Sequence, residues 1–253
     1  MVLQISEIID MTNWDSLWLK EENIQALRGP SFRHKVRIVK RLIRTYAELR
    51  EGVTILDVAC GTGDFLNTVA DIPASLNGID SSAVAIERAR KNCALCHFKV
   101  LDIEKNTPEG AFDIVTCMNA LEEMKDDDSA LSHIADSVRK NGYLIIVTPH
   151  SMKYWTKKDE DALNVRRYET DELIAKCEKA GFDPVTIYVW GWPLFDAYYR
   201  IMAGANQESM LKSRVRRYAV RLIQAFLYAA FFIDDFFASF GKGRILFAVF
   251  KKR

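Results

Sequence analysis

Residues 54–64 read TILDVACGTGD. The first half of this stretch is an aliphatic and β-branched run, which is typical of a buried parallel strand, and the second half is made of small residues. Gly61 and Gly63 permit a tight turn with positive φ and leave no Cβ between the backbone and a ligand. Asp57 ends the strand with a carboxylate. The stretch therefore predicts a strand followed by a turn that approaches a ligand closely.

The spacing of the small residues separates two kinds of nucleotide site. A dinucleotide-binding fingerprint needs a further glycine three residues after Gly63, and Leu66 stands there. The pattern Asp57-x-Ala59-x-Gly61-x-Gly63 instead resembles the first motif of class I S-adenosylmethionine-dependent methyltransferases. Ala59 stands where that family usually has its first glycine, and alanine keeps the site small. The resemblance implies S-adenosylmethionine as cofactor.

Acidic residues recur where the following strands are expected to end. Asp80 is placed to accept hydrogen bonds from both ribose hydroxyls of an adenosine, and Ser81 or Ser82 to cap a helix over 83–92. The resemblance implies that Asp102 binds the adenine amino group and that its apolar neighbour covers the ring. The predicted cofactor contacts are Asp57, Ala59, Cys60, Gly61, Gly63, Asp80, Ser81, Asp102, Ile103, Asn119 and Leu121.

The resemblance also implies the fold class, which is an α/β, Rossmann-like, seven-stranded and mostly parallel sheet with helices on both faces. The last strand is expected to be antiparallel and to pair at the sheet edge in a hairpin, and residues 138–142 to form a helix end and a glycine turn. We expect a single domain over 1–253. Its parts are a helical cap (1–50), the cofactor-binding core (51–190), a helical lid or membrane-proximal insertion (191–243) and the final strand (244–253).

Composition and cysteine content limit the other readings. A net charge of +1 gives no global field that would steer nucleic acid, so a nucleic-acid partner is not expected. No leader pattern opens the chain, and the five cysteines are odd in number, so we expect reduced, mostly buried thiols in a cytoplasmic protein. Cys93-Ala-Leu-Cys96-His97 matches a haem-attachment motif and half of a zinc site, but without a second ligand pair we expect apolar packing and no metal.

Two helical segments are candidates for contacts with a partner. The helix expected over 32–46, capped by Ser31, has one apolar face and one basic face, which either is solvated or binds a membrane or nucleic acid. The apolar run 222–233 is too short to span a bilayer, which needs about 20 residues. It either roofs an acceptor pocket or lies at a membrane surface with arginines 214–221 on lipid phosphates. Both readings favour an apolar or lipid-linked acceptor. Trp14, Trp18 and Phe32 are candidates to close over the methyl donor.

A hydroxyl acceptor needs a base near the tip of the fourth strand. Many small-molecule O-methyltransferases carry Leu-Glu-His there, whereas this chain has Leu121-Glu122-Glu123. Residues 117–123 also resemble the same region of quinone-pathway O-methyltransferases. Glu123 and His150 are therefore the candidate catalytic residues. The alternative is that the two glutamates only begin an exposed acidic helix.

The residues and the resemblance together predict a methyltransferase acting on a hydroxyl of a small apolar or lipid-linked molecule, with peripheral membrane contact as an option. A nucleic-acid or protein methyltransferase and a non-catalytic cofactor-binding module remain as alternatives.

Overall fold

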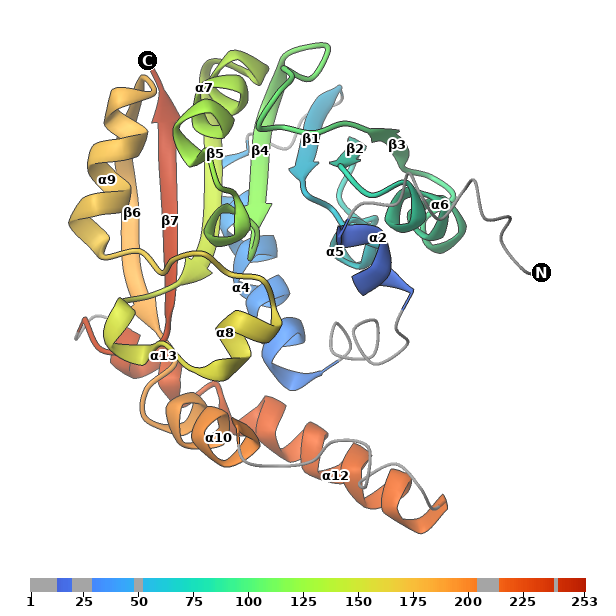
Figure 1. Ribbon diagram of the computed structural model, residues 1–253, viewed down its shortest axis with the longest axis vertical. Helices are drawn as coiled ribbons and strands as arrows, with labels where there is room; N and C mark the ends of the chain where they lie inside the picture. Colours follow the sequence, from blue (N-terminus) through green and yellow to red (C-terminus); the bar gives the residue numbers. More distant parts are fainter. Residues whose placement is uncertain (1–12, 20–28, 48–51, 204–213, 239–240) are drawn as a thin grey trace.

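The computed structural model describes residues 13–19, 29–47, 52–203, 214–238 and 241–253 (Figure 1). Part of the predicted N-terminal cap, residues 1–12 and 20–28, lies outside the described residues. The chain forms a seven-stranded sheet with the order β3-β2-β1-β4-β5-β7-β6, in which only β7 is antiparallel to its neighbours. The predicted fold class is thereby confirmed. The strands are β1 (Val53–Val58), β2 (Ala74–Asp80), β3 (His97–Val100), β4 (Phe112–Met118), β5 (Val138–Pro149), β6 (Phe182–Trp190) and β7 (Ile245–Lys252).

The position of β7 corrects one expectation. It lies between β5 and β6 and not at the edge, and helices separate it from β6 in the chain, so no simple hairpin joins them. The residues of β7 from Ile245 to Phe250 are all buried, as an interior strand requires, whereas β6 exposes residues 183–185 at the edge. Val138 is the C-cap of α7, as the expected helix end requires, but residues 138–142 already open β5, with a shifted register against β4.

Helices cover both faces of the sheet, because successive residues of a strand point to opposite sides (Figure 1). Leu56 and Val58 of β1 belong to the core shared with α7 (Asp127–Ser137) and α9 (Thr170–Lys179). Ile55 belongs to the core on the other face, with α4 (Pro30–Tyr46) and α5 (Asp64–Thr68). Near β2 and β3, α6 (Ala83–Asn92) is capped by Ser82, whose hydroxyl accepts from the Ala85 amide.

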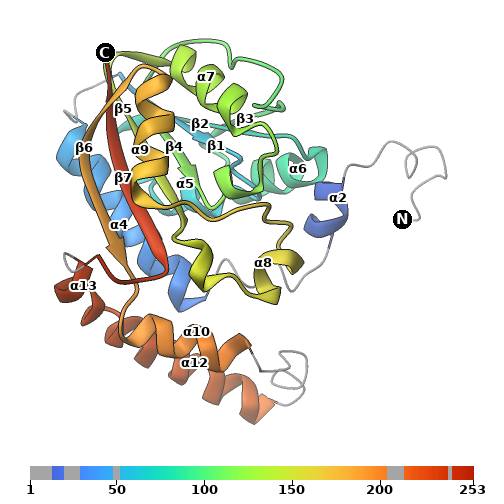
Figure 2. The ribbon, with the colours of Figure 1, turned by 60° about the vertical axis from the view of Figure 1, so that its left-hand side comes forward.

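The shorter elements gather beyond the carboxyl ends of the parallel strands, as both views of the ribbon show (Figures 1 and 2). They are α2 (Asn13–Trp18), η1 (Leu121–Glu123), η2 (Met152–Tyr154) and α8 (Lys157–Asp161). The segment between β6 and β7 adds α10 (Leu194–Ala203), α12 (Arg214–Ala230) and α13 (Asp234–Phe237) at the same end.

The insertion between β6 and β7 is tied to the rest of the fold. Phe231 is fully buried beside Trp190, with 5.9 Å between ring centroids. The buried Asp234 carboxylate accepts hydrogen bonds from the backbone amides of Leu194 and Phe195, at 2.9 and 2.8 Å. One face of α12 nevertheless stays in solvent, with Leu222, Ile223 and Phe226 exposed. Within the described ranges, no helix is both long and apolar enough to cross a membrane.

Helix α4 uses much of its basic face inside the protein. It begins at Pro30 with Gly29 as N-cap, so the predicted cap by Ser31 is wrong. Arg37 pairs with Asp235, and its guanidinium lies over the Phe232 ring. Lys35 is buried. This part of the basic face is therefore neither simply solvated nor free to bind a membrane or nucleic acid, because it packs inside the protein.

The expectation of reduced, mostly buried cysteines is confirmed for three of the five residues and is wrong for the other two. Cys60, Cys117 and Cys177 are buried free thiols. Cys93 and Cys96 form a disulfide, because the short turn between α6 and β3 brings their Cα atoms to 5.5 Å. Among the residues described, no group of three or more histidine, cysteine or acidic side chains is arranged to hold a metal.

Candidate functional site

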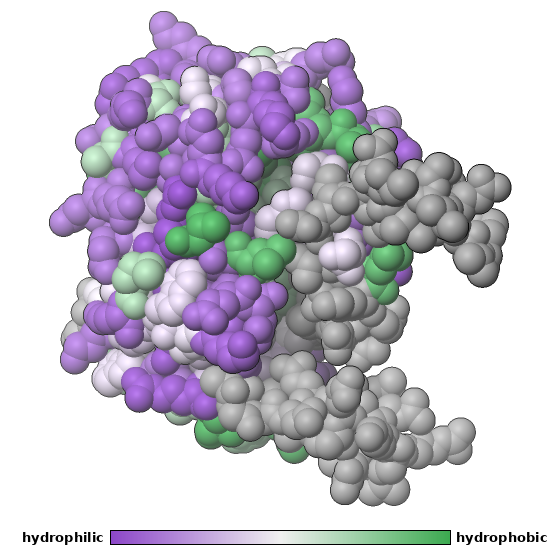
Figure 3. All heavy atoms as spheres, in the orientation of Figure 1, coloured by the Kyte–Doolittle hydropathy of each residue, from purple (hydrophilic) through white to green (hydrophobic). Residues whose placement is uncertain are grey.

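A cavity of about 780 Å³ lies at the carboxyl ends of β1, β2 and β4. Its walls come from α2, from the first turns of α4, and from α8 and α10. These helices are far apart in the sequence. Ligand sites typically have volumes of roughly 300–1,000 Å³, so this cavity has room for a nucleoside-sized molecule and a second small one. In the space-filling view the surrounding face is mostly hydrophilic, and hydrophobic residues gather around a central hollow (Figure 3).

The turn after β1 forms one wall of the cavity. Ala59, Gly61 and Gly63 all have left-handed backbone, with φ of 54°, 52° and 73°. The Asp80 carboxylate at the tip of β2 fixes this turn, because it accepts hydrogen bonds from the amides of Gly61 and Ser82, both at 2.9 Å. Two adjacent strand ends are therefore linked through one acidic side chain.

Two acids in this wall are strongly desolvated. Burial raises the pKa of Asp57 to about 7, although the Thr116 hydroxyl donates to its carboxylate at 2.7 Å. Burial also raises the pKa of Asp80, against the effect of its two amide donors. The electrostatic cost of these buried acids is what a positively charged ligand would relieve.

The structure brings most of the predicted cofactor residues together. Those that line the cavity are Asp57, Ala59, Cys60, Gly61, Asp80, Ser81, Asp102, Ile103 and Asn119. Leu121 is not among the lining residues and is buried in the core. Gly63 is also outside the lining: a Cβ there would meet Phe98 and Ala89 at 2.9 and 3.1 Å, so this glycine lets α5 pack closely. Trp14, Trp18 and Phe32 all line the cavity.

The two candidate bases lie in different places. Glu123 lines the cavity, where burial, Glu122 and Asp80 raise the pKa of its carboxyl well above the usual range. His150 is not among the lining residues; its Nδ1 lies 3.1 Å from the carbonyl oxygen of Gly243. The structure therefore places Glu123, and not His150, at the cavity.

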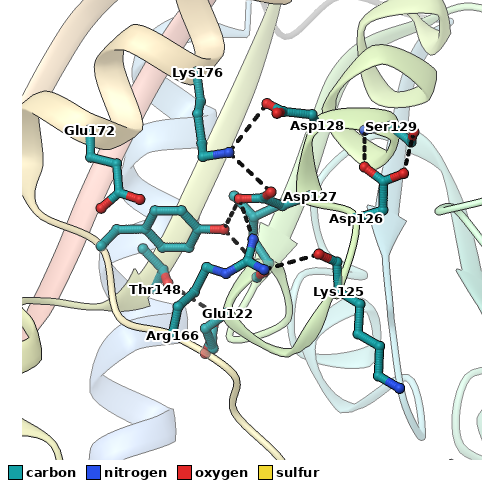
Figure 4. Close-up of polar contacts among 12 residues, drawn as sticks. Glu122, Lys125, Asp126, Asp127, Asp128, Ser129, Thr148, Arg166, Glu172 and Lys176 are labelled. Atoms are coloured by element: carbon teal, nitrogen blue, oxygen red, sulfur yellow. Dashed lines mark hydrogen bonds and ion pairs between the residues drawn. The ribbon is translucent and has the colours of Figure 1, made fainter.

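The acidic run after η1 serves the structure (Figure 4). Asp127 is buried, accepts from the Tyr168 hydroxyl at 2.6 Å and pairs with Arg166 and Lys176 at 2.6 and 3.0 Å. The alternative of an exposed acidic helix start is therefore wrong for Glu122, and also for Asp127, at which α7 begins, because both are buried. The network of Asp127 anchors the segment that also holds Glu122.

Glu122 faces the cavity from the same segment. Its carboxylate accepts from the Thr148 hydroxyl at 3.0 Å, and burial raises its pKa to about 7 (Figure 4).

Several lining residues escaped the sequence analysis. Lys35 of α4 is only 9% exposed, and its Nζ donates to Asn119 Oδ1 at 2.7 Å. The one signal for it is that it follows Phe32 by three residues, on the same helix face. Arg244 lines the cavity from the segment before β7, together with Arg167 from the segment after η2, and only the three-dimensional structure shows Arg244 there.

Comparison with known proteins identifies the family. A family model described as "Methyltransferase domain" matches residues 31–187. The mitochondrial ubiquinone biosynthesis O-methyltransferase of Schizosaccharomyces pombe is 32% identical over 104 residues, which cover 38% of each chain. The enzyme of the same name from Bordetella avium is 28% identical over 161 residues, 56% of this chain and 67% of that one. The chain thus spans about two fifths of the length of the first of these relatives.

Solved structures share the fold at low sequence identity. A magnesium protoporphyrin IX methyltransferase from Synechocystis, solved with bound SAH, has a TM-score of 0.56 at 14% identity, over 87% of this chain and 82% of that one. An S-adenosylmethionine-dependent methyltransferase from Mesorhizobium loti also has a TM-score of 0.56, at 15% identity over 84% and 96% of the two chains. Because the family model covers more than half of the sequence, this chain belongs to the methyltransferase domain family.

Proposed function

We propose that this methyltransferase binds S-adenosylmethionine at the tips of β1, β2 and β3 and methylates a hydroxyl group of a small apolar or lipid-linked acceptor. The observation that carries the proposal is the linked wall formed by Gly61 and Asp80, with Asp102 and Ile103 in the same cavity. Gly61 offers backbone without a Cβ, and Asp80 keeps lone pairs for ribose hydroxyls. The residues present therefore fit the adenosine part of the cofactor.

The chemistry of the methyl donor determines what the protein itself has to contribute to the reaction. When bound, S-adenosylmethionine supplies a methyl group already activated by a positively charged sulfur. The protein then has to align the acceptor and exclude water, and alignment of that kind can contribute about 7–11 kcal/mol. Asp57 and Asp80 place two carboxyl groups in the wall that would face the cofactor, where a cationic ligand would favour their ionised forms, and Trp14 and Trp18 cover the cavity from α2.

The acceptor side of the cavity is aromatic. Phe195, Tyr198 and Tyr199 of α10 line it together with Phe32 of α4. Such walls suit a planar or hydrocarbon group better than a small polar one. The relatives named ubiquinone biosynthesis O-methyltransferases support a hydroxyl acceptor related to a quinone precursor.

An acceptor with a lipid tail would be met at a membrane surface, and we include peripheral membrane contact in the proposal. Its support is the exposed apolar face of α12, formed by Leu222, Ile223 and Phe226. Co-sedimentation with phosphatidylglycerol vesicles tests it. Phe226→Asp should weaken binding, whereas Val185→Asp, at an exposed position on edge strand β6, should not. Equal vesicle binding by both variants would remove membrane contact from the proposal.

Calorimetry with S-adenosylhomocysteine tests the cofactor site directly. Asp80→Ala should weaken binding about 10- to 100-fold, the scale of hydrogen bonds to a charged group. Asp183→Ala is the matched control, because Asp183 is an exposed acid on β6. Absence of binding heat with the wild-type protein would overturn the proposal.

The acceptor class is tested by transfer of a labelled methyl group to two catechol probes. One is 3,4-dihydroxybenzoate and the other is the same ring with a prenyl chain, presented in detergent. We expect a methyl ether from both and faster transfer to the prenylated probe. Methylation only of protein or nucleic acid in a cell extract would instead favour the macromolecular alternative.

A further inference from the structure

Lys35 is a buried amine held at the tip of β4. It is the sixth residue of α4, lines the cavity, and donates from Nζ to Asn119 Oδ1 at 2.7 Å. Asn119 lies just after β4 in left-handed backbone, with φ of 49°. Its backbone N–H donates to the Val147 carbonyl at 2.7 Å. Both ends of the contact are therefore fixed by secondary structure, and the amine is presented to the cavity in one place.

The surroundings of Lys35 favour a neutral amine more than those of an ordinary lysine do. Desolvation lowers its pKa to about 8, although the negative charge of Glu122 opposes that shift. Among the described residues, no carboxylate forms an ion pair with Lys35, so the charge has no direct partner there. The other ionisable groups that line the same cavity include Asp57, Glu123, Lys158, Arg167 and Arg244.

The other titratable groups near this strand tip are poor bases. Burial and its acidic neighbours raise the pKa of Glu123 well above its ordinary value. Glu122 is 1% exposed, and the Thr148 hydroxyl occupies its Oε2. His150 does not line the cavity. Glu122 and Lys35 are the groups lining the cavity at this tip that have a proton-accepting atom, and Lys35 is the one that Asn119 holds at the strand end.

We propose that Lys35 is the general base that removes the proton from the acceptor hydroxyl, with Asn119 as the residue that positions its amine. This inference rests on the proposed O-methyl transfer. The acceptor oxygen forms its bond to the methyl carbon while the carbon–sulfur bond of the donor breaks and its electron pair stays on sulfur. The hydroxyl proton passes to the lone pair of the neutral Lys35 amine, which becomes an ammonium group. The proton then leaves to solvent after the product departs.

A titration of Lys35 tests the inference without any acceptor. Reductive methylation with ¹³C-formaldehyde labels the lysines, and Lys35→Arg identifies the Lys35 resonance by its loss. We expect this resonance to titrate near pH 8, well below those of surface lysines. Titration together with the surface lysines would overturn the base role.

Turnover of the catechol probes separates a base from a cation that merely attracts the acceptor. Lys35→Met and Lys35→Arg should both lower kcat by about 10²- to 10⁴-fold, since arginine stays protonated and cannot accept the proton. S-adenosylhomocysteine affinity should change less than threefold in both. Lys40→Met on the same helix, outside the cavity lining, should keep turnover within about threefold.

The pH profile provides the sharpest contrast. Wild-type kcat/KM should rise with pH and level off above the Lys35 pKa, whereas the Lys35→Met rate should keep rising with hydroxide concentration. Added ethylamine should partly restore turnover by Lys35→Ala. Full activity of Lys35→Arg, with wild-type turnover intact, would overturn this inference alone. Absence of cofactor binding or turnover by the wild-type protein would instead overturn the proposed function.

Discussion

The indole ring of Trp18 packs on the backbone of Gly61, and a Cβ added at Gly61 would lie 2.8 Å from two atoms of that ring. The contact joins α2 to the turn after β1, at the cavity wall. Two constraints require a glycine at this position. Its φ of 52° is in the left-handed region, and the Trp18 ring leaves no room for a side chain. The turn and the helix that covers it therefore depend on one residue.

Gly61→Ala should displace Trp18 and weaken binding of S-adenosylhomocysteine by tenfold or more, measured by calorimetry. Gly52→Ala is the matched control, because Gly52 also has positive φ, 84°, but a Cβ there meets nothing within 4 Å. Both variants place an alanine in strained backbone, but only Gly61→Ala also adds a clash between the new Cβ and the Trp18 ring. Equal affinities in both would show that the Trp18 contact has no role in binding.

The sequence was sufficient for features determined by neighbouring residues. The run ending in Gly61 and Gly63 and the acid at Asp80 predicted strand ends and a ligand-facing turn, because the relevant distances are short along the chain. It was insufficient where distant segments pair. The place of β7 depends on hydrogen bonds to both β5 and β6, which strand propensity does not determine.

Lys35 shows the same limit at the site. Lys35 is separated from Asn119 by 84 positions in the sequence, so the contact depends on how α4 packs against the sheet. A basic helix with one apolar face gave no sign that this lysine points inward. The Cys93–Cys96 disulfide was missed because the spacing of two cysteines does not reveal whether the turn brings them within bonding distance.

Ala59 carries strain that glycine would relieve. Its φ of 54° is in the left-handed region, which costs an alanine about 1–2 kcal/mol. Glycine loses more conformational entropy on folding, by about 0.4–1 kcal/mol, so the gain is partly offset. Ala59→Gly should therefore leave the free energy of unfolding unchanged or raise it by up to about 1.6 kcal/mol in urea titrations.

Ala135→Gly provides the contrast, because Ala135 lies inside α7, where glycine costs about 1 kcal/mol. A loss at Ala59→Gly as large as the one at Ala135→Gly would contradict the left-handed backbone at Ala59.

Asp57 should make the protein less stable as the pH rises toward neutrality. Burial raises its folded-state pKa to about 7, whereas an unfolded aspartate has a pKa of about 3.9. Between these values the native state holds a proton that the unfolded state releases, so the free energy of unfolding falls with increasing pH. Asp57→Asn cannot ionise, and its stability relative to wild type should grow from pH 4 to pH 8 in urea titrations.

Asp113 should behave in the opposite sense and serves as the control. Burial alone would raise its pKa, but hydrogen bonds from Thr54 and the guanidinium of Arg139 outweigh that effect and lower it. Its stabilisation is present above the unfolded pKa and is lost on acidification. Asp113→Asn should therefore be less stable than wild type at pH 7 and approach it near pH 3. Parallel pH profiles for the two variants would contradict these assignments.

Two carboxylates of α8 allow a direct comparison of buried and exposed ion pairs. Asp159 binds Arg167 through two hydrogen bonds of 2.8 and 3.0 Å, and both side chains are 2% exposed. Asp161 lies 3.7 Å from Lys157, with side chains 65% and 82% exposed. Asp159→Ala leaves a buried guanidinium unpaired and should cost about 3–5 kcal/mol. Asp161→Ala should cost at most about 1 kcal/mol.

Equilibrium unfolding in urea measures both losses, and a double variant identifies the cause. If the cost of Asp159→Ala comes from the unpaired charge of Arg167, adding Arg167→Met should recover part of the stability, because no buried charge then remains. Further loss in the double variant would show that packing and not charge dominates at this position. Arg167 also donates to the His150 carbonyl and lines the cavity, so the same pair holds α8 in place as part of the cavity wall.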